Sequence, residues 1–306
     1  MRALYELPAP AKLNLFLHVV GRRADGYHLL QSVFVLIDWC DTLHLERRGD
    51  GRLDRHDLGL ALPADDLCLR AARALQRESG TNFGADISID KRLPSGAGMG
   101  GGSSDAATTL LALNRLWQLD WPRPRLQALG LTLGADLPFF LGGSNAFVEG
   151  TGERLTPITL PRQWLAVAKP GASVATRAIF GSPLLARDTE AVILESFLAD
   201  ASASRGFGSG AFGRNDLQPQ AVIQCPEISE AADWLAARFG NSRMTGSGSA
   251  VFAGAGTGAE PVTPMPAGLP PGWVGRMCRS LEQHPLQGFA EGCKRLEVSG
   301  AGRGPA

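Results

Sequence analysis

The sequence predicts an α+β fold built from two domains. Two observations indicate this: predicted strands and helices follow one another in mixed order rather than in strict alternation, and 306 residues exceed what a single hydrophobic core usually serves. The apolar fraction of 44% and the charged fraction of 20% are ordinary for globular proteins. Disordered and fibrous classes are therefore poor explanations of this chain.

The first predicted elements are two strands joined by a turn. Across residues 11–19 apolar side chains alternate with others, including Lys12 and Asn14, which is the period of a half-buried strand. Lys12 and Asn14 are therefore expected on the same face. The dipeptide Asp25-Gly26 predicts a turn, and residues 32–37 predict the second strand.

The remaining elements follow from helical or strand periodicity between turn signals. Asp65 is a plausible N-terminal cap of the first helix, and the segment 134–143, which holds Asp136, is expected to be a break. Helices are predicted at residues 63–79, 103–119, 123–133, 190–199 and 229–239, and strands at residues 85–91, 145–149, 164–168, 250–253 and 273–277.

A domain boundary is predicted within residues 154–161, where a Gly-Thr-Gly turn and two prolines interrupt the pattern. We therefore expect an N-terminal domain at residues 1–155 and a C-terminal domain at residues 156–286. Residues 287–306 are expected to be an extension that ends in a disordered tail, and the Pro- and Gly-rich residues 255–272 an exposed loop.

The composition argues against several kinds of binding partner and bears on the cellular location. Thirty basic and thirty acidic residues cancel, which argues against a surface that binds nucleic acid. The five cysteines and five histidines show no spacing typical of a disulfide framework or a zinc site. The chain lacks an apolar run of about 20 residues and a signal-peptide pattern, so we expect a cytoplasmic protein without membrane contact.

A glycine-rich segment directly before a predicted helix is the central feature. A helix start offers unpaired N–H groups and partial positive charge, so a di- or triphosphate could bind there without many basic side chains. The hydroxyls of Ser103 and Ser104 could contact phosphate or a phosphate-bound Mg²⁺ ion. The predicted phosphate-binding residues are Pro94, Ser95, Gly96, Ala97, Gly98, Met99, Gly100, Gly101, Gly102, Ser103 and Ser104.

Other interpretations of this segment are weaker. Gly96, Gly98 and Gly101 satisfy G-x-G-x-x-G, but the preceding strand alternates polar with apolar residues, unlike the buried first strand of a Rossmann domain. A P-loop would need Lys after its last glycine, and Ser103 follows Gly102 instead. So many turn-permissive positions beside a strong helix also make a merely flexible turn improbable.

Four segments in order resemble the GHMP kinase family: residues 8–15, 98–107, 134–140 and 245–250. The resemblance covers residues 8–286. It implies an N-terminal nucleotide-binding domain, a C-terminal ferredoxin-like domain and an active site between them. It also implies ATP as phosphate donor, with Mg²⁺ expected on the nucleotide, and a catalytic Asp and Lys beside the accepting hydroxyl. These correspond to Asp136 and Lys12.

Residues 23–28 resemble a family member whose small-molecule substrate is a cytidine-diphosphate-linked methylerythritol. The resemblance implies cytosine contacts through His28, helped by Tyr27 and Phe180, and it makes Asn14 and Thr176 further substrate-site candidates. Without it, Asp136 could equally be a turn or capping residue. A mevalonate-type or sugar kinase and a non-catalytic nucleotide-binding sensor remain as alternatives.

Overall fold

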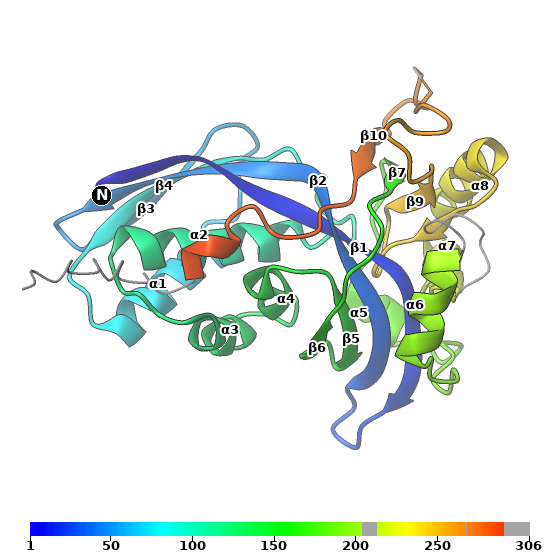
Figure 1. The fold of residues 1–306 in the computed structure, drawn as a ribbon, viewed down its shortest axis with the longest axis horizontal. Coiled ribbons are helices and arrows are strands. Elements are labelled where there is room, and N and C mark those ends of the chain that lie inside the picture. Colours follow the sequence, from blue (N-terminus) through cyan, green and yellow to red (C-terminus); the bar gives the residue numbers. More distant parts are fainter. Residues whose placement is uncertain (204–212, 267, 291–306) are drawn as a thin grey trace, which may run out of the picture.

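The computed structural model describes residues 1–203, 213–266 and 268–290. Two β-sheets, each with helices packed against it, lie side by side and are joined through the long strands β1 and β2 (Figure 1). The predicted α+β fold is confirmed. None of the helices in the described ranges has the length and apolar character needed to cross a bilayer.

The first sheet has six strands. Its order is β3-β4-β2-β5-β6, with β1 paired to β2, and only the β3–β4 pair is parallel. The two strands predicted first are confirmed but much longer than predicted, because β2 pairs with β4 at one end and with β5 at the other. The strands are β1 (Ala3–Arg22), β2 (His28–Arg48), β3 (Leu53–Asp57), β4 (Gly84–Asp90), β5 (Ala146–Gly150) and β6 (Arg154–Pro157).

Strand β1 is irregular where its candidate functional residues lie. Its pairing with β2 shifts register between Pro10 and Lys12 and again between Asn14 and Leu17. Such bulges bend a strand and redirect its side chains, and they also accommodate proline within a sheet. The segment from Lys12 to Asn14 is thus a short regular stretch between two bends.

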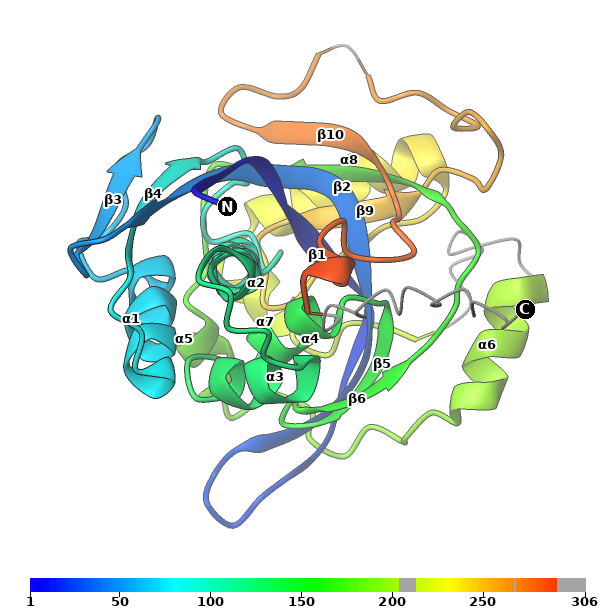
Figure 2. The same cartoon turned by 60° about the vertical axis from the view of Figure 1, so that its left-hand side comes forward.

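The helices beside this sheet are α1 (Leu67–Ser79), α2 (Gly101–Leu116), α3 (Arg123–Leu131) and α4 (Leu137–Gly142). Helix α2 lies between the sheet and the other helices, which explains why most of its residues are buried (Figure 2). Two predictions were wrong here. The cap of α1 is Asp66, whose Oδ1 accepts a hydrogen bond from the Leu69 N–H at 3.1 Å, while Asp65 pairs with Arg73.

The second wrong prediction concerns residues 134–143, which were expected to be a break between elements but contain the helix α4. Pro138 lies in the first turn of α4, where the missing N–H costs no helical hydrogen bond. The helix is stable despite its six residues because Leu137, Phe139 and Phe140 are buried in the core.

The second sheet has four antiparallel strands in the order β10-β7-β9-β8. Along the chain, helices lie between β7 and β8. Together with this strand order, they make a ferredoxin-like arrangement. In the described part of the connection from β9 to β10, residues 255–266 and 268–273, there is no helix. The elements are β7 (Trp164–Lys169), α5 (Thr176–Phe180), α6 (Leu194–Ala203), α7 (Gln218–Gln224), α8 (Glu227–Phe239), β8 (Arg243–Met244), β9 (Val251–Gly254) and β10 (Val274–Arg279).

After β10 the chain returns to the first sheet. The Leu281 N–H donates to the Leu36 carbonyl at 2.8 Å, and the short 3₁₀ helix η1 (Gln287–Ala290) packs beside α2 (Figures 1 and 2). The start of the predicted C-terminal extension is therefore part of the N-terminal core. The predicted disordered tail lies outside the described residues, and the domain boundaries stay a prediction.

Candidate active site

The glycine-rich segment forms a loop whose backbone requires glycine. Gly96, Gly98 and Gly100 have φ of 62°, 74° and 71°, the left-handed region that other residues rarely adopt. At Gly98 a Cβ atom would lie 2.4 Å from the Thr245 carbonyl oxygen, so the backbones also approach too closely for a side chain. The loop ends at Gly100, the N-cap of α2.

Both halves of the molecule hold this loop. The Lys12 N–H of β1 donates to the Met99 carbonyl at 3.0 Å, and the Ser249 N–H donates to the Gly96 carbonyl at 3.0 Å. The Ala250 N–H donates to the Ala97 carbonyl at 3.2 Å. Because these bonds use carbonyls, the N–H groups at the start of α2 stay available to an anion.

The loop forms one wall of a cavity of about 700 Å³. Ten of the eleven predicted phosphate-binding residues, Pro94 to Ser103, line it, and the opposite wall is formed by residues 60–63, Asp65, Asp66, Leu67 and Arg70. The prediction for Ser104 needs correction. Ser104 is fully buried and its hydroxyl donates to the Pro10 carbonyl at 2.7 Å, so it points away from this cavity.

Sequence reasoning missed a charged cluster beneath the loop. Lys91, at the loop's entrance, pairs with the buried carboxylates of Asp41 and of Asp105, which lies on α2 with its Oδ2 2.6 Å from Lys91 Nζ. Asp41 also accepts the Leu93 N–H at 2.7 Å. Burial raises the pKa of Asp105 to about 8 against the opposing charge of Lys91. The cluster ties the entrance of the loop to the helix that follows it.

Lys12 and Asp136 meet in a second cavity of about 300 Å³. The Lys12 Nζ atom lies 3.9 Å from Asp136 Oδ2 and 4.5 Å from the centre of the Phe34 ring. Burial lowers the pKa of Lys12, and the charge of Asp136 opposes that shift. Asp136 is the N-cap residue of α4, but its side chain makes no capping hydrogen bond. Its carboxylate lines the cavity and is therefore available to a ligand there.

Asn14 lines the same cavity, but its amide is used within the protein. Its Oδ1 accepts from Lys12 Nζ at 2.5 Å, and its Nδ2 donates to the Ser32 hydroxyl at 3.0 Å. The predicted shared face of Lys12 and Asn14 is therefore confirmed. Thr176 lies across the cavity, with its hydroxyl 2.6 Å from that of Ser247. Asn14 thus holds the Lys12 ammonium, and Thr176 belongs to the C-terminal wall.

A third cavity of about 690 Å³ contains the residues predicted to recognise cytosine. His28, at the start of β2, and Phe180, at the end of α5, have ring centres 5.0 Å apart. Tyr27 lines the same cavity and is 66% exposed, which leaves its ring face accessible to a ligand. Arg22 and Arg177 also line it, and they carry no sequence signal that separates them from surface arginines.

The Lys12–Asp136 cavity adjoins the other two cavities. Gly96, Gly98 and Gly100 line both the glycine-loop cavity and the Lys12–Asp136 cavity. Leu30 and Phe180 line both the Lys12–Asp136 cavity and the His28 cavity. A ligand in the first can therefore meet a ligand in the third beside Lys12 and Asp136.

Comparison with known proteins identifies this arrangement. Models of the GHMP kinases N terminal domain and of the GHMP kinases C terminal region match residues 66–144 and 198–261. A 4-diphosphocytidyl-2-C-methyl-D-erythritol kinase from Methylibium petroleiphilum is 66% identical over 94% of this chain and 98% of its own. The chain belongs to the GHMP kinase family. It is a small-molecule kinase, and GHMP kinases use ATP as phosphate donor.

This GHMP kinase is also similar to solved structures. A crystal structure of 4-(cytidine 5'-diphospho)-2C-methyl-D-erythritol kinase shares 37% identity and a TM-score of 0.71, over 82% of this chain and 90% of that one. A mevalonate kinase from L. major, solved with R-mevalonate, has a TM-score of 0.61 at 17% identity, over 82% of this chain and 87% of that one. The second likeness shows the fold alone.

Proposed function

We propose that this GHMP kinase transfers the γ-phosphoryl group of ATP to the 2-hydroxyl of 4-diphosphocytidyl-2-C-methyl-D-erythritol, which gives the 2-phosphate and ADP. This reaction belongs to the methylerythritol phosphate route to isoprenoid precursors. The observation that carries the proposal is the position of Lys12 and Asp136 in a cavity that adjoins both the glycine loop and the pocket of His28 and Phe180. Relatives that carry this name cover nearly the whole chain at 66% and 56% identity.

The glycine-loop cavity is the proposed ATP site. The N–H groups of Gly101, Gly102 and Ser103 open α2. The first N–H group used within the helix is that of Ser104, which donates to the Gly100 carbonyl at 2.9 Å. These donors and the helix dipole stabilise negative charge on the phosphates. The wall of residues 60–67 would take the adenine.

The His28 cavity is the proposed cytidine site, and the substrate's diphosphate would then extend toward Lys12. Tyr27 and Phe180 offer aromatic faces to the base, and the pocket's Arg22 and Arg177 supply positive charge. Thr176 is a proposed contact of the substrate between the cytidine site and Lys12, since it lies on α5 and lines the Lys12–Asp136 cavity.

The chemistry requires alignment more than strong activation of the nucleophile. Phosphoryl transfer has a loose transition state in which charge spreads over the γ-phosphoryl oxygens. We propose that Asp136 orients the accepting hydroxyl and takes its proton, while Lys12 stabilises the developing charge. The ammonium of Lys12 is positioned for this by Asn14 and by the Phe34 ring.

Mg²⁺ is expected to arrive with the nucleotide. Within the described ranges there is no group of three or more His, Cys, Asp or Glu side chains that could hold a metal ion. Ser103 fits as a single hydroxyl ligand, because it lies in the first turn of α2 and lines the ATP cavity. When bound with the nucleotide, the ion would neutralise part of the negative charge on the phosphates.

An ADP-release assay tests the proposal. The enzyme is supplied with Mg·ATP and, in separate reactions, 4-diphosphocytidyl-2-C-methyl-D-erythritol, mevalonate or galactose. We expect substrate-dependent ADP only with the cytidylyl compound. Faster turnover of mevalonate or a sugar would favour those alternatives, and no turnover of any substrate would favour a nucleotide-binding sensor. The cytoplasmic location stays a prediction from the sequence.

A further inference from the structure

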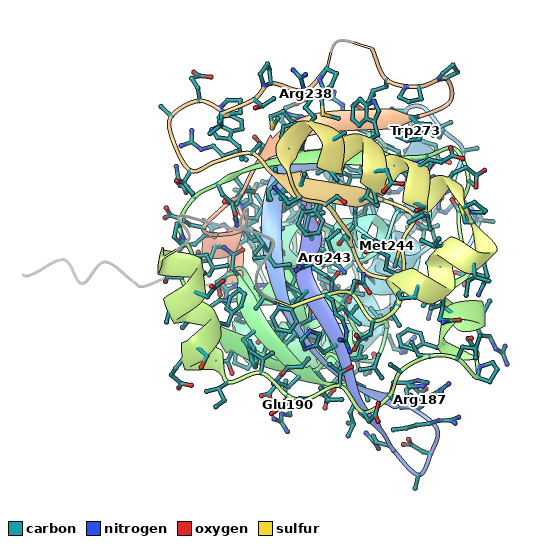
Figure 3. All side chains as sticks on the ribbon, turned by 90° about the vertical axis from the view of Figure 1, so that its right-hand side faces the viewer. Arg187, Glu190, Arg238, Arg243, Met244 and Trp273 are labelled. Atoms are coloured by element: carbon teal, nitrogen blue, oxygen red, sulfur yellow. The ribbon has the colours of Figure 1, made fainter. Side chains whose placement is uncertain are left out.

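Arg187 connects His28, on one side of the His28 cavity, to the chain segment that follows Phe180 on the other side. It lies in the irregular chain after α5, near the hairpin between β1 and β2 (Figure 3). Its Nε–H donates to His28 Nε2 at 3.1 Å. The rest of its guanidinium donates to backbone carbonyls of its own segment, to Leu185 at 2.9 Å and to Ser182 at 2.7 Å. The donor facing His28 is therefore held in place from the Phe180 side.

This contact determines where the imidazole proton lies. A guanidinium is always protonated in proteins and has no lone pair to accept with, so His28 Nε2 must be the acceptor. Burial lowers the pKa of His28, and the positive charges of Arg187 and Arg22 lower it further. A neutral imidazole carries one N–H, which must then be on Nδ1.

Among the described residues no hydrogen-bond partner faces His28 Nδ1, whereas His28 itself lines the pocket. The charged groups that share this pocket are Arg22, Arg177 and Asp25. Asp25 makes no hydrogen bond to the His28 ring, because its carboxylate accepts the Tyr27 N–H at 3.2 Å and pairs with Arg23. The Nδ1–H is thus left for a ligand in the pocket.

We propose that Arg187 is a specificity-determining positioning residue that fixes His28 in the Nδ1–H tautomer, so that the ring presents a hydrogen-bond donor to the base. Cytosine has a lone pair at N3, whereas uracil carries a hydrogen there. A fixed donor at Nδ1 therefore pairs with cytosine N3 and opposes uracil N3–H. The inference deepens the proposed function, since it rests on a pyrimidine nucleotide occupying this pocket.

The first test is ¹⁵N NMR of the protein labelled with ¹⁵N-histidine, in which ring-nitrogen shifts distinguish the two neutral tautomers. His28→Ala assigns the His28 signals by their loss. We expect protonated Nδ1 in the wild type, a shift toward protonated Nε2 in Arg187→Met, and recovery in Arg187→Lys, whose ammonium can still donate. Protonated Nε2 in the wild type would overturn the inference without any variant.

The second test is binding of CDP and UDP, measured by calorimetry. We expect the wild type to prefer CDP by at least about tenfold, and Arg187→Met to lose most of that preference. Arg162→Met, which removes an exposed arginine paired with Glu282, is the matched control and should keep the preference. An unchanged CDP preference in folded Arg187→Met would contradict the assignment.

These outcomes are separable from the proposed function. The tautomer and the nucleotide preference are measured without phosphoryl transfer, so they can hold even if the wild type fails to phosphorylate the cytidylyl compound. For the same reason, normal kinase activity combined with protonated Nε2 would leave the proposed function intact and refute the role of Arg187.

Discussion

Replacing Asp136 with Asn tests the proposed chemistry, because it keeps the shape of the side chain and removes its charge and basicity. The carboxylate lies 3.9 Å from Lys12 Nζ. At an effective dielectric constant of about 20 this pair would interact by about 4 kcal/mol. Asp136 is 34% exposed, so solvent screening reduces the interaction below this value.

The rate effect has two sources in this variant. Loss of a general base typically costs about 10²–10⁴ in rate, and a loose transition state places this enzyme at the lower end. Without Asp136 the pKa of Lys12, already lowered by burial, falls further and weakens charge stabilisation. We therefore expect kcat to fall about 10²-fold, equivalent to about 2.7 kcal/mol.

The assay is steady-state ADP release at saturating cytidylyl substrate, combined with calorimetric ATP binding. ATP affinity should be unchanged or slightly higher, because a negative charge near the triphosphate is gone. Asp54→Asn, which changes a 52% exposed carboxylate on β3, is the control and should keep full activity. A kcat within about twofold of wild type would refute proton transfer by Asp136.

Three further predictions concern the loop, the base pocket and pH. Gly98→Ala should weaken ATP binding and lower the free energy of unfolding by about 2 kcal/mol or more, because of the positive φ and the nearby Thr245 carbonyl; wild-type ATP affinity and urea unfolding would contradict this. His28→Ala should raise KM for the cytidylyl substrate about ten- to a hundredfold and leave KM for ATP unchanged; equal increases in both would indicate a structural role. Burial lowers the pKa of His284 to about 4, with the charge of Arg123 adding to the effect. The pKa of this histidine in the unfolded chain is about 6.5. The neutral imidazole therefore contributes fully to the free energy of unfolding above pH 6.5, and about 3 kcal/mol of that free energy is lost as the pH falls through 4. Urea unfolding of His284→Gln should show a weaker pH dependence than wild type, and an identical profile would rule this out.

The sequence predicted the parts of this molecule that depend on local pattern. The glycine loop before α2 was found because glycines and helical periodicity are adjacent along the chain. Lys12 and Asn14 were placed on one face by the period of β1, and the structure joins them at 2.5 Å. In each case neighbours in sequence are neighbours in space.

Features that depend on distant contacts could not be predicted in this way. The helix α4 was missed because its six residues are stabilised by burial of Phe139 and Phe140 rather than by length or capping. Ser104 was misplaced because its partner, the Pro10 carbonyl, is 94 residues away. Arg187 gave no signal, because it lies in irregular chain and meets His28 only through the fold.

Product analysis by ³¹P NMR tests the central claim most directly. Wild-type enzyme with Mg·ATP and one equivalent of 4-diphosphocytidyl-2-C-methyl-D-erythritol should yield ADP and one new phosphomonoester signal in equal amounts, with the diphosphate signals of the substrate retained. Release of ADP with inorganic phosphate and no phosphomonoester would contradict direct transfer between the adjoining cavities.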